Sequence, residues 1–153
     1  MQKITPYLWF DDQAEEAMEY YTSIFPNSKI VETMRPNPDG PILGGTFEIH
    51  GQEFMLLNGG PQFKFNESIS LFVKCETQEE VDYLWNKLTT DGGEESMCGW
   101  LKDKYGLSWQ IIPNLLGQLM GDPDPEKAQR VMQAMLKMRK IECSVLQQAY
   151  DGV

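Results

Sequence analysis

The sequence contains few of the residues on which common functional sites depend. Its 153 residues include one histidine, His50, and three cysteines, Cys75, Cys98 and Cys143. An odd number of widely spaced cysteines is typical of reduced thiols and argues against a disulfide framework or a zinc site. His50 precedes Gly51, and this pair predicts a solvated hairpin turn rather than a metal ligand or a catalytic base.

Basic residues and long apolar runs are scarce as well. Lys and Arg number 13 against 23 Asp and Glu, which gives a net charge of −10 and argues against a nucleic-acid partner. No apolar run approaches the ~18 residues of a membrane helix, and the start MQKITPYLWF lacks the apolar core of a signal peptide. We therefore expect a cytoplasmic protein that binds neither nucleic acid nor membrane.

The sequence does contain an internal repeat, and enough apolar residues, 41%, to build a core. Residues 14–25, AEEAMEYYTSIF, align with residues 78–89, QEEVDYLWNKLT, 64 positions later. Each copy follows a short apolar stretch and precedes a strand that begins with glycine. The repeat predicts two similar β-α-β units that bury their apolar faces.

Local signals divide the repeats into elements. Asp12 with Glu15, and Thr77 with Glu80, predict capping boxes at the starts of the two helices. Pro and Gly residues predict a loop or an interrupted edge strand at 35–45. The expected strands lie at 4–10, 29–34, 45–50, 52–58, 68–75, 94–102 and 107–112.

The tail is predicted to be helical. Asp124 is a suitable N-cap with Pro125 in the first helical position, and a second short helix is expected at 142–150. An apolar stripe follows the first of these helices: Ala128, Val131, Met132, Met135 and Met138. A Met-rich stripe of this kind either packs into the core or forms an adaptable docking surface.

Several of these segments resemble one protein family. The opening TPYLWF, the helix AEEAMEYY and above all CGWLKDKYGLSWQIIP at 98–113 resemble the PhnB-like branch of the glyoxalase/bleomycin-resistance/dioxygenase (vicinal oxygen chelate) superfamily. This branch is also labelled 3-demethylubiquinone methyltransferase-like. The tail AQRVMQAMLKMRKIE at 128–142 extends the resemblance.

The resemblance implies an α+β fold of two βαβββ modules, at 1–60 and 66–115, with curved mixed sheets. A C-terminal helical extension at 123–150 completes what we expect to be one structural domain overall. Members of the superfamily commonly pair as homodimers, so a homodimer is expected here. Their small ligands or metal ions bind in the concave face of the sheets.

In the metal-using relatives, the ligands come from the first and last strands of each module. Those positions fall here near Pro6 or Thr5, and at Met55, Ser70 and Gln110. Only Gln110 has ordinary metal-ligand chemistry, whereas a metal centre typically requires about three protein ligands. We therefore expect no metal and no cofactor. A methyl donor is not expected either, because the sequence lacks the strand-GxGxxG-helix unit that usually holds one.

Strand alternation predicts what the concave face contains instead. With a period of two, the inward-facing candidates for ligand binding are Leu8, Met55, Ser70, Phe72, Ser108 and Gln110, while Phe54, Leu56 and Ile111 face the helices. This set suits a neutral, partly apolar small molecule held by hydrogen bonds to Gln110 and Ser70. The alternative is that the same side chains only fill a small core.

Three functions remain open from the sequence. The first is metal-independent binding of a small molecule, by sequestration or sensing. The second is a metal-dependent isomerase, lyase or oxygenase of the same superfamily. The third is an interaction protein that docks a partner on the Met-rich C-terminal helix.

Overall fold

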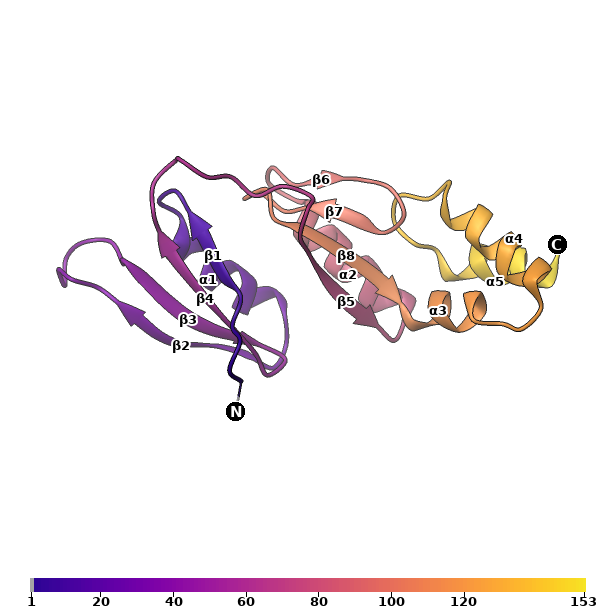
Figure 1. Cartoon of the computed structure of the whole chain (residues 1–153), viewed down its shortest axis with the longest axis horizontal. Helices are drawn as coiled ribbons and strands as arrows, with labels where there is room; N and C mark the ends of the chain where they lie inside the picture. The colour runs from indigo at the N-terminus through magenta and orange to yellow at the C-terminus, as the bar shows by residue number, and fades with distance from the viewer. Residues whose placement is uncertain (1) are drawn as a thin grey trace. The chain divides into compact units, whose positions relative to one another are not determined.

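A computed structural model describes residues 2–153, which form two four-stranded mixed sheets and five helices (Figure 1). The α+β prediction is thereby confirmed. The chain divides into two compact units, Met1–Phe65 and Asn66–Val153, and the C-terminal helices belong to the second. None of the described helices is long and apolar enough to cross a membrane.

The first unit has the order β-α-β-β-β. Its elements are β1 (Tyr7–Phe10), α1 (Ala14–Ile24), β2 (Ser28–Met34), β3 (Gly44–Ile49) and β4 (Gln52–Asn58). The strands lie in the order β1-β4-β3-β2, with β1 parallel to β4 and the other pairs antiparallel. The predicted hairpin turn joins β3 to β4, where exposed His50 and Gly51 have positive φ angles of 50° and 78°.

Helix α1 covers one face of this sheet. Its apolar side buries Ala14, Ala17, Met18, Tyr21 and Ile24 against the sheet residues Phe47, Phe54 and Leu56. The ring of Tyr21 stacks on that of Phe47, and Phe47 stacks on Phe54, with centroid distances of 5.9 and 5.3 Å. The opposite face of the sheet carries no helix of this unit.

The start of α1 differs from the predicted capping box. The N-cap residue is Gln13, which makes no side-chain cap, so the assignment of this role to Asp12 is wrong. Asn58 at the end of β4 supplies the acceptor instead, since its Oδ1 accepts a hydrogen bond from the Ala14 amide at 2.8 Å. The Asn58 amide also donates to the Ile42 carbonyl at 3.1 Å, so one side chain ties the helix start to the 35–43 loop.

The second unit repeats this plan with shorter strands. Its elements are β5 (Ser70–Cys75), α2 (Gln78–Thr89), β6 (Glu94–Glu95), β7 (Trp100–Lys102) and β8 (Ser108–Pro113), in the sheet order β5-β8-β7-β6. The predicted cap of α2 is confirmed, because Thr77 Oγ1 accepts from the Glu80 amide at 3.2 Å. The Glu80 carboxylate in turn accepts a hydrogen bond from the Glu76 amide at 2.9 Å.

Asp103 fixes the turn that leads into β8. Its side chain is 2% exposed and accepts hydrogen bonds from the Tyr105 and Leu107 amides at 2.9 and 3.1 Å. It also accepts from the indole nitrogen of Trp109 at 2.9 Å. Gly106 has a φ of 86° in this turn, in the left-handed region that favours glycine.

Three helices complete the second unit: α3 (Asn114–Met120), α4 (Pro125–Met135) and α5 (Cys143–Asp151). The predicted cap of α4 is confirmed by a 3.0 Å bond from the Glu126 amide to Asp124 Oδ1. Helix α3 was not predicted. The three helices share an apolar cluster whose buried members are Ile112, Leu116, Leu119, Val131, Met138, Ile141 and Leu146. Most of the predicted stripe therefore packs inward, although Met132 is 41% exposed.

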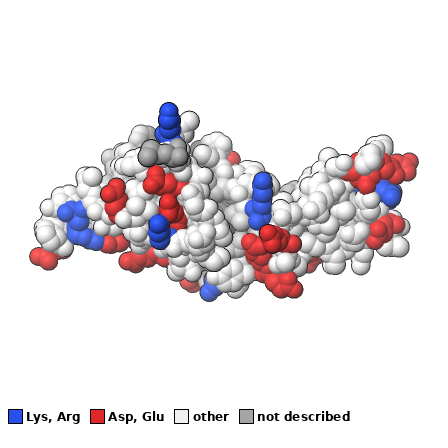
Figure 2. All heavy atoms as spheres, turned by 90° about the horizontal axis from the view of Figure 1, so that it is seen from below, with Lys and Arg blue, Asp and Glu red and all other residues white. Residues whose placement is uncertain are grey.

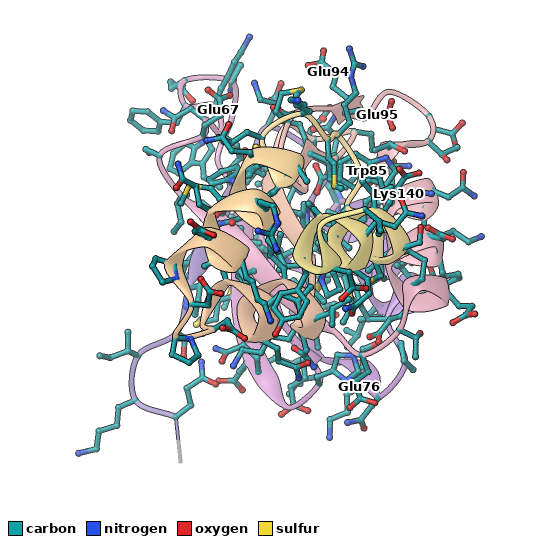
Figure 3. The ribbon with its side chains drawn as sticks, turned by 90° about the vertical axis from the view of Figure 1, so that its right-hand side faces the viewer. Glu67, Glu76, Trp85, Glu94, Glu95 and Lys140 are labelled. Atoms are coloured by element: carbon teal, nitrogen blue, oxygen red, sulfur yellow. The ribbon has the colours of Figure 1, made fainter. Side chains whose placement is uncertain are left out.

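The segment between α4 and α5 is bonded to the sheet and to α2. The amides of Cys98 and Gly99 each donate at 2.8 Å to the carbonyls of Met138 and Arg139. Gln78 at the start of α2 donates to the Ile141 carbonyl at 3.0 Å and accepts from the Cys143 amide at 2.7 Å. In Figure 3, Trp85, Glu95 and Lys140 mark the same side of this unit, where the Trp85 indole donates to Glu95 at 2.6 Å.

Asp103 provides a first test of this account. We expect Asp103→Ala to lower the free energy of unfolding of the second unit by about 3–5 kcal/mol, since the buried Trp109 indole and two amides lose their acceptor. Asp103→Asn keeps one carbonyl oxygen and should cost roughly 1–3 kcal/mol. Urea denaturation followed by Trp fluorescence measures the free energy of unfolding of both variants. Negligible changes in both would contradict the structural role given to the Asp103 carboxylate.

Gln78 provides a second test, aimed at the docking hypothesis for the tail. We expect Gln78→Ala to destabilise the second unit by about 1–3 kcal/mol, because two backbone groups lose their partner. Amide hydrogen exchange at Cys143 and Leu146 should accelerate. Gln129→Ala, an exposed change on α4, is the matched control. An unchanged exchange rate in the Gln78 variant would show that the tail does not depend on this contact.

Candidate functional site

The face of the first sheet opposite α1, here called the first open face, carries the candidate site. Residues paired across neighbouring strands place their side chains on the same face. One row runs from Glu32 on β2 through Thr46 and Met55 to Tyr7 on β1. The next row runs from Met34 through Gly44 and Leu57 to Trp9. Met55 therefore lies on the face predicted for it.

Leu8 does not lie on this face, and its prediction as an inward-facing residue is wrong. It pairs with Leu56, is 8% exposed and points to the side that α1 covers. The repeat of 64 residues holds for the helices, but residues 11–13 join β1 to α1 whereas only residues 76–77 join β5 to α2. One extra residue reverses the face of every side chain on a strand, so Tyr7 and Trp9 take the place expected for Pro6 and Leu8.

A bulge in β2 decides which of its residues reaches the open face. The pairing of β2 with β3 shifts between Ile30 and Glu32, so that Val31 is the extra residue. Bulges of this kind redirect the side chains that follow them. Because of the shift, Glu32 stands opposite Thr46 on the open face, and Met34 stands opposite Gly44.

The first open face contains a hollow of about 480 Å³. The side chains that line it include Tyr7, Glu32, Met34, Leu43, Met55 and Leu57. Gly44 leaves room between Met34 and Leu57, and a Cβ there would meet the Leu56 carbonyl at 2.8 Å. The hollow is apolar along most of its wall, with one carboxylate at the β2 side.

The second open face, on the sheet side opposite α2, brings Ser70, Phe72 and Gln110 together. Gln110 pairs with Phe72 and with Trp100, and its amide donates to Ser70 Oγ at 3.0 Å. Phe72 is 54% exposed. Ser108 pairs with Ser70 but is 1% exposed, and within residues 2–153 its hydroxyl has no hydrogen-bond partner. A ligand on this face can reach the first three residues, whereas Ser108 is covered.

Two of the cysteines lie away from both open faces. Cys98 has a φ of 60° in the loop that bonds to Met138 and Arg139, so it belongs to a structural contact. Burial, with contributions from nearby Glu80 and Cys143, raises the pKa of the Cys75 thiol to about 12. A thiol of this kind stays protonated at neutral pH and is a poor nucleophile.

The first and last strands of the two units do not offer a donor set for a metal ion. Their residues on the side away from α1 or α2 are Tyr7, Trp9, Glu53, Met55 and Leu57 in the first unit, and Ser70, Phe72, Lys74, Ser108, Gln110 and Ile112 in the second. Each unit thus offers one ordinary oxygen ligand at these positions, Glu53 in the first and Gln110 in the second, whereas a metal centre typically requires about three protein ligands. Across residues 2–153, no group of three or more His, Cys, Asp or Glu is placed to hold an ion. These positions do not fit a metal.

Sequence and structure comparisons agree on the family that this chain resembles. The model of the family described as 3-demethylubiquinone-9 3-methyltransferase matches residues 2–112. The chain belongs to this PhnB-like family. The match ends before the tail at 128–142, to which the sequence resemblance had been extended. No curated protein matches the chain.

Among solved structures, a PhnB protein from Bacillus cereus described by the same methyltransferase name is 42% identical, with a TM-score of 0.67. The similarity covers 73% of this chain and 99% of that chain. A glyoxylase/bleomycin resistance protein/dioxygenase domain from Frankia is 14% identical, with a TM-score of 0.51 over 74% of this chain and 92% of its own.

The fosfomycin resistance protein FosX from Listeria monocytogenes, solved with Mn(II) and sulfate, is 16% identical with a TM-score of 0.50. That likeness covers 71% of this chain and 89% of FosX. The PhnB-like chain thus has the glyoxalase superfamily fold, as the sequence motifs predicted.

The site that emerges includes residues that the sequence did not single out. Tyr7, Glu32, Met34 and Leu43 all line the hollow of the first unit. A signal for Tyr7 was present in the length of the connection between strand and helix, which differs between the repeats. The position of Glu32 depends on the bulge at Val31, for which the sequence contains no recognised signal.

Proposed function

We propose that this PhnB-like protein binds a small, partly apolar molecule without a metal ion, on the open faces of its sheets. The observation that carries the proposal is the hollow of about 480 Å³ on the first open face. Its volume falls in the range of about 300–1,000 Å³ that is typical of small-molecule sites, and such sites are mostly apolar with few polar groups.

The side chains of the hollow support binding rather than core filling. Tyr7 and Met34 are 56% and 61% exposed, and Leu43 is 50% exposed. Large apolar side chains that remain this exposed around one depression gain free energy when a ligand covers them. Side chains of a filled core would be buried, as Phe47 and Leu56 are on the other face.

On the second open face, Gln110 and Ser70 are the side chains that we propose form hydrogen bonds with the ligand. Gln110 and Ser70 are already bonded to each other, which fixes both side chains, and exposed Phe72 lies beside them. An amide held in this way presents its carbonyl oxygen to a donor on the ligand. The proposed ligand-binding residues are therefore Met55, Ser70, Phe72 and Gln110, with Tyr7 in place of Leu8.

The methyltransferase name of the family does not enter the proposal. The strands of both units lead into helices through short connections at 11–13 and 76–77 that contain no glycine. Methyl donors are usually held at a glycine-rich turn between strand and helix. Sequestration or sensing of the bound molecule needs no such turn.

Ligand-induced stabilisation tests the proposal. In a broad library of aromatic and aliphatic metabolites, we expect at least one compound to raise the Tm, because a ligand at a hundred times its Kd stabilises by about 2.7 kcal/mol. Met55→Lys should remove the shift by placing a charge in the hollow. Ile4→Lys makes the same change at a residue that is 87% exposed and does not line the hollow, and it should keep the shift. A library without a single hit would refute the proposal.

A homodimer is proposed together with this function. Strand β2 ends the first sheet, and its side chains Ile30, Val31 and Met34 are 40%, 46% and 61% exposed. An edge strand with unpaired backbone groups and apolar side chains favours pairing with a second copy.

Light scattering at micromolar concentration should accordingly give twice the 17.6 kDa mass of the chain. Ile30→Lys is expected to shift the mass toward the monomer, because the edge strand would then carry a charge into the contact. Ile69→Lys, at a residue outside the strands that is 60% exposed, is the control. A monomeric wild-type chain would contradict the dimer.

A further inference from the structure

The hollow on the first open face contains one feature that its apolar wall does not explain. Of the described residues that line it, Glu32 is the one charged side chain. The nearby basic residues are engaged elsewhere, since Arg35 pairs with Glu15 and Lys29 pairs with Glu48. Within residues 2–153, Glu32 has no ion-pair partner.

The position of Glu32 is set by the strand geometry. The bulge at Val31 places Glu32 opposite Thr46, in the row that continues through Met55 to Tyr7. Strands in a sheet lie about 4.8 Å apart, so the row from Glu32 to Tyr7 spans roughly 14 Å. It runs from a carboxylate at one end, over a thioether, to an aromatic ring at the other.

From this row we infer that the hollow selects an organic cation: an amine with an apolar, preferably aromatic, body. The ammonium group lies at Glu32 and the apolar body extends over Met55 and Leu57 toward Tyr7. The inference rests on the proposed function and names the class of its ligand.

The negative charge of Glu32 and of the protein as a whole favours an organic cation over a neutral or anionic ligand. An unpaired carboxylate beside an apolar surface repels anions and can accept a hydrogen bond from a neutral donor, whereas an ammonium ion both donates to it and offsets its charge. The protein as a whole carries a net charge of −10, and carboxylates are spread over the face drawn in Figure 2. Such a field raises the local concentration of cations and lowers that of anions.

The test compares two compounds that differ in one group, 4-phenylbutylamine and 4-phenylbutan-1-ol, bound to the full chain. Amide chemical shifts followed by NMR during titration give both the affinity and the position of binding. We expect the amine to bind about two- to fivefold more tightly than the alcohol, the factor of an exposed ion pair. The largest shifts should fall on β2, β3 and β4.

Two variants separate Glu32 from the general charge of the protein. Glu32→Gln should reduce the preference for the amine to about one, whereas Glu19→Gln removes the same charge from an exposed position on α1 and should keep it. Added salt should lower the affinity for the amine and leave the affinity for the alcohol unchanged, because salt screens the attraction between exposed charges.

The outcomes distinguish this inference from the proposal on which it rests. Equal affinities for the two compounds, both abolished by Met55→Lys, would overturn the inference and retain the binding function. A preference for the amine that survives Glu32→Gln would also overturn it. Failure of the amine to bind at millimolar concentration would do the same, while neutral library compounds that stabilise the protein would still support the binding function.

Discussion

One helix packs against each four-stranded sheet, and this one-sided covering is the constraint on which the rest of the structure depends. In the first unit, α1 buries Phe47, Phe54 and Leu56 and leaves the opposite side chains of the same strands uncovered. The strands alternate, so each residue belongs either to the core or to the open face. The face under α1 therefore holds the buried core of the unit, and the opposite face is the one on which we propose that a ligand binds.

In the second unit, the C-terminal helices add to the buried core that α2 forms with the sheet. They extend its core from Ile112 at the end of β8 through the cluster around Val131 and Leu146. Backbone bonds from Cys98 and Gly99 to the segment before α5, and the two bonds of Gln78, fasten the tail to the sheet and to α2. A tail held by buried apolar contacts and backbone bonds is poorly suited to leave and dock a partner, which weakens the interaction hypothesis.

The sequence predicted the architecture because the repeat, the helix periodicity and the turn residues all report local structure. Thr77 and Asp124 were assigned as caps correctly, and His50 with Gly51 marked the hairpin turn. The errors arose where a contact between residues distant in sequence determines the local structure. Asn58 replaces Asp12 as the side-chain cap of α1, although it lies 44 residues after Ala14, whose amide it accepts. No local pattern identifies such a cap.

The candidate site was predictable only in part, for a related reason. Met55, Ser70, Phe72 and Gln110 lie on open faces, but Leu8 does not, because one residue more in the connection to α1 turns β1 over. The bulge at Val31 acts in the same way on β2. Two sheets built on the same plan can therefore present different side chains on their open faces when the chain between two elements gains or loses a single residue. In a duplicated fold of this kind, chain length is itself a source of new specificity, and an alignment that scores substitutions alone overlooks it.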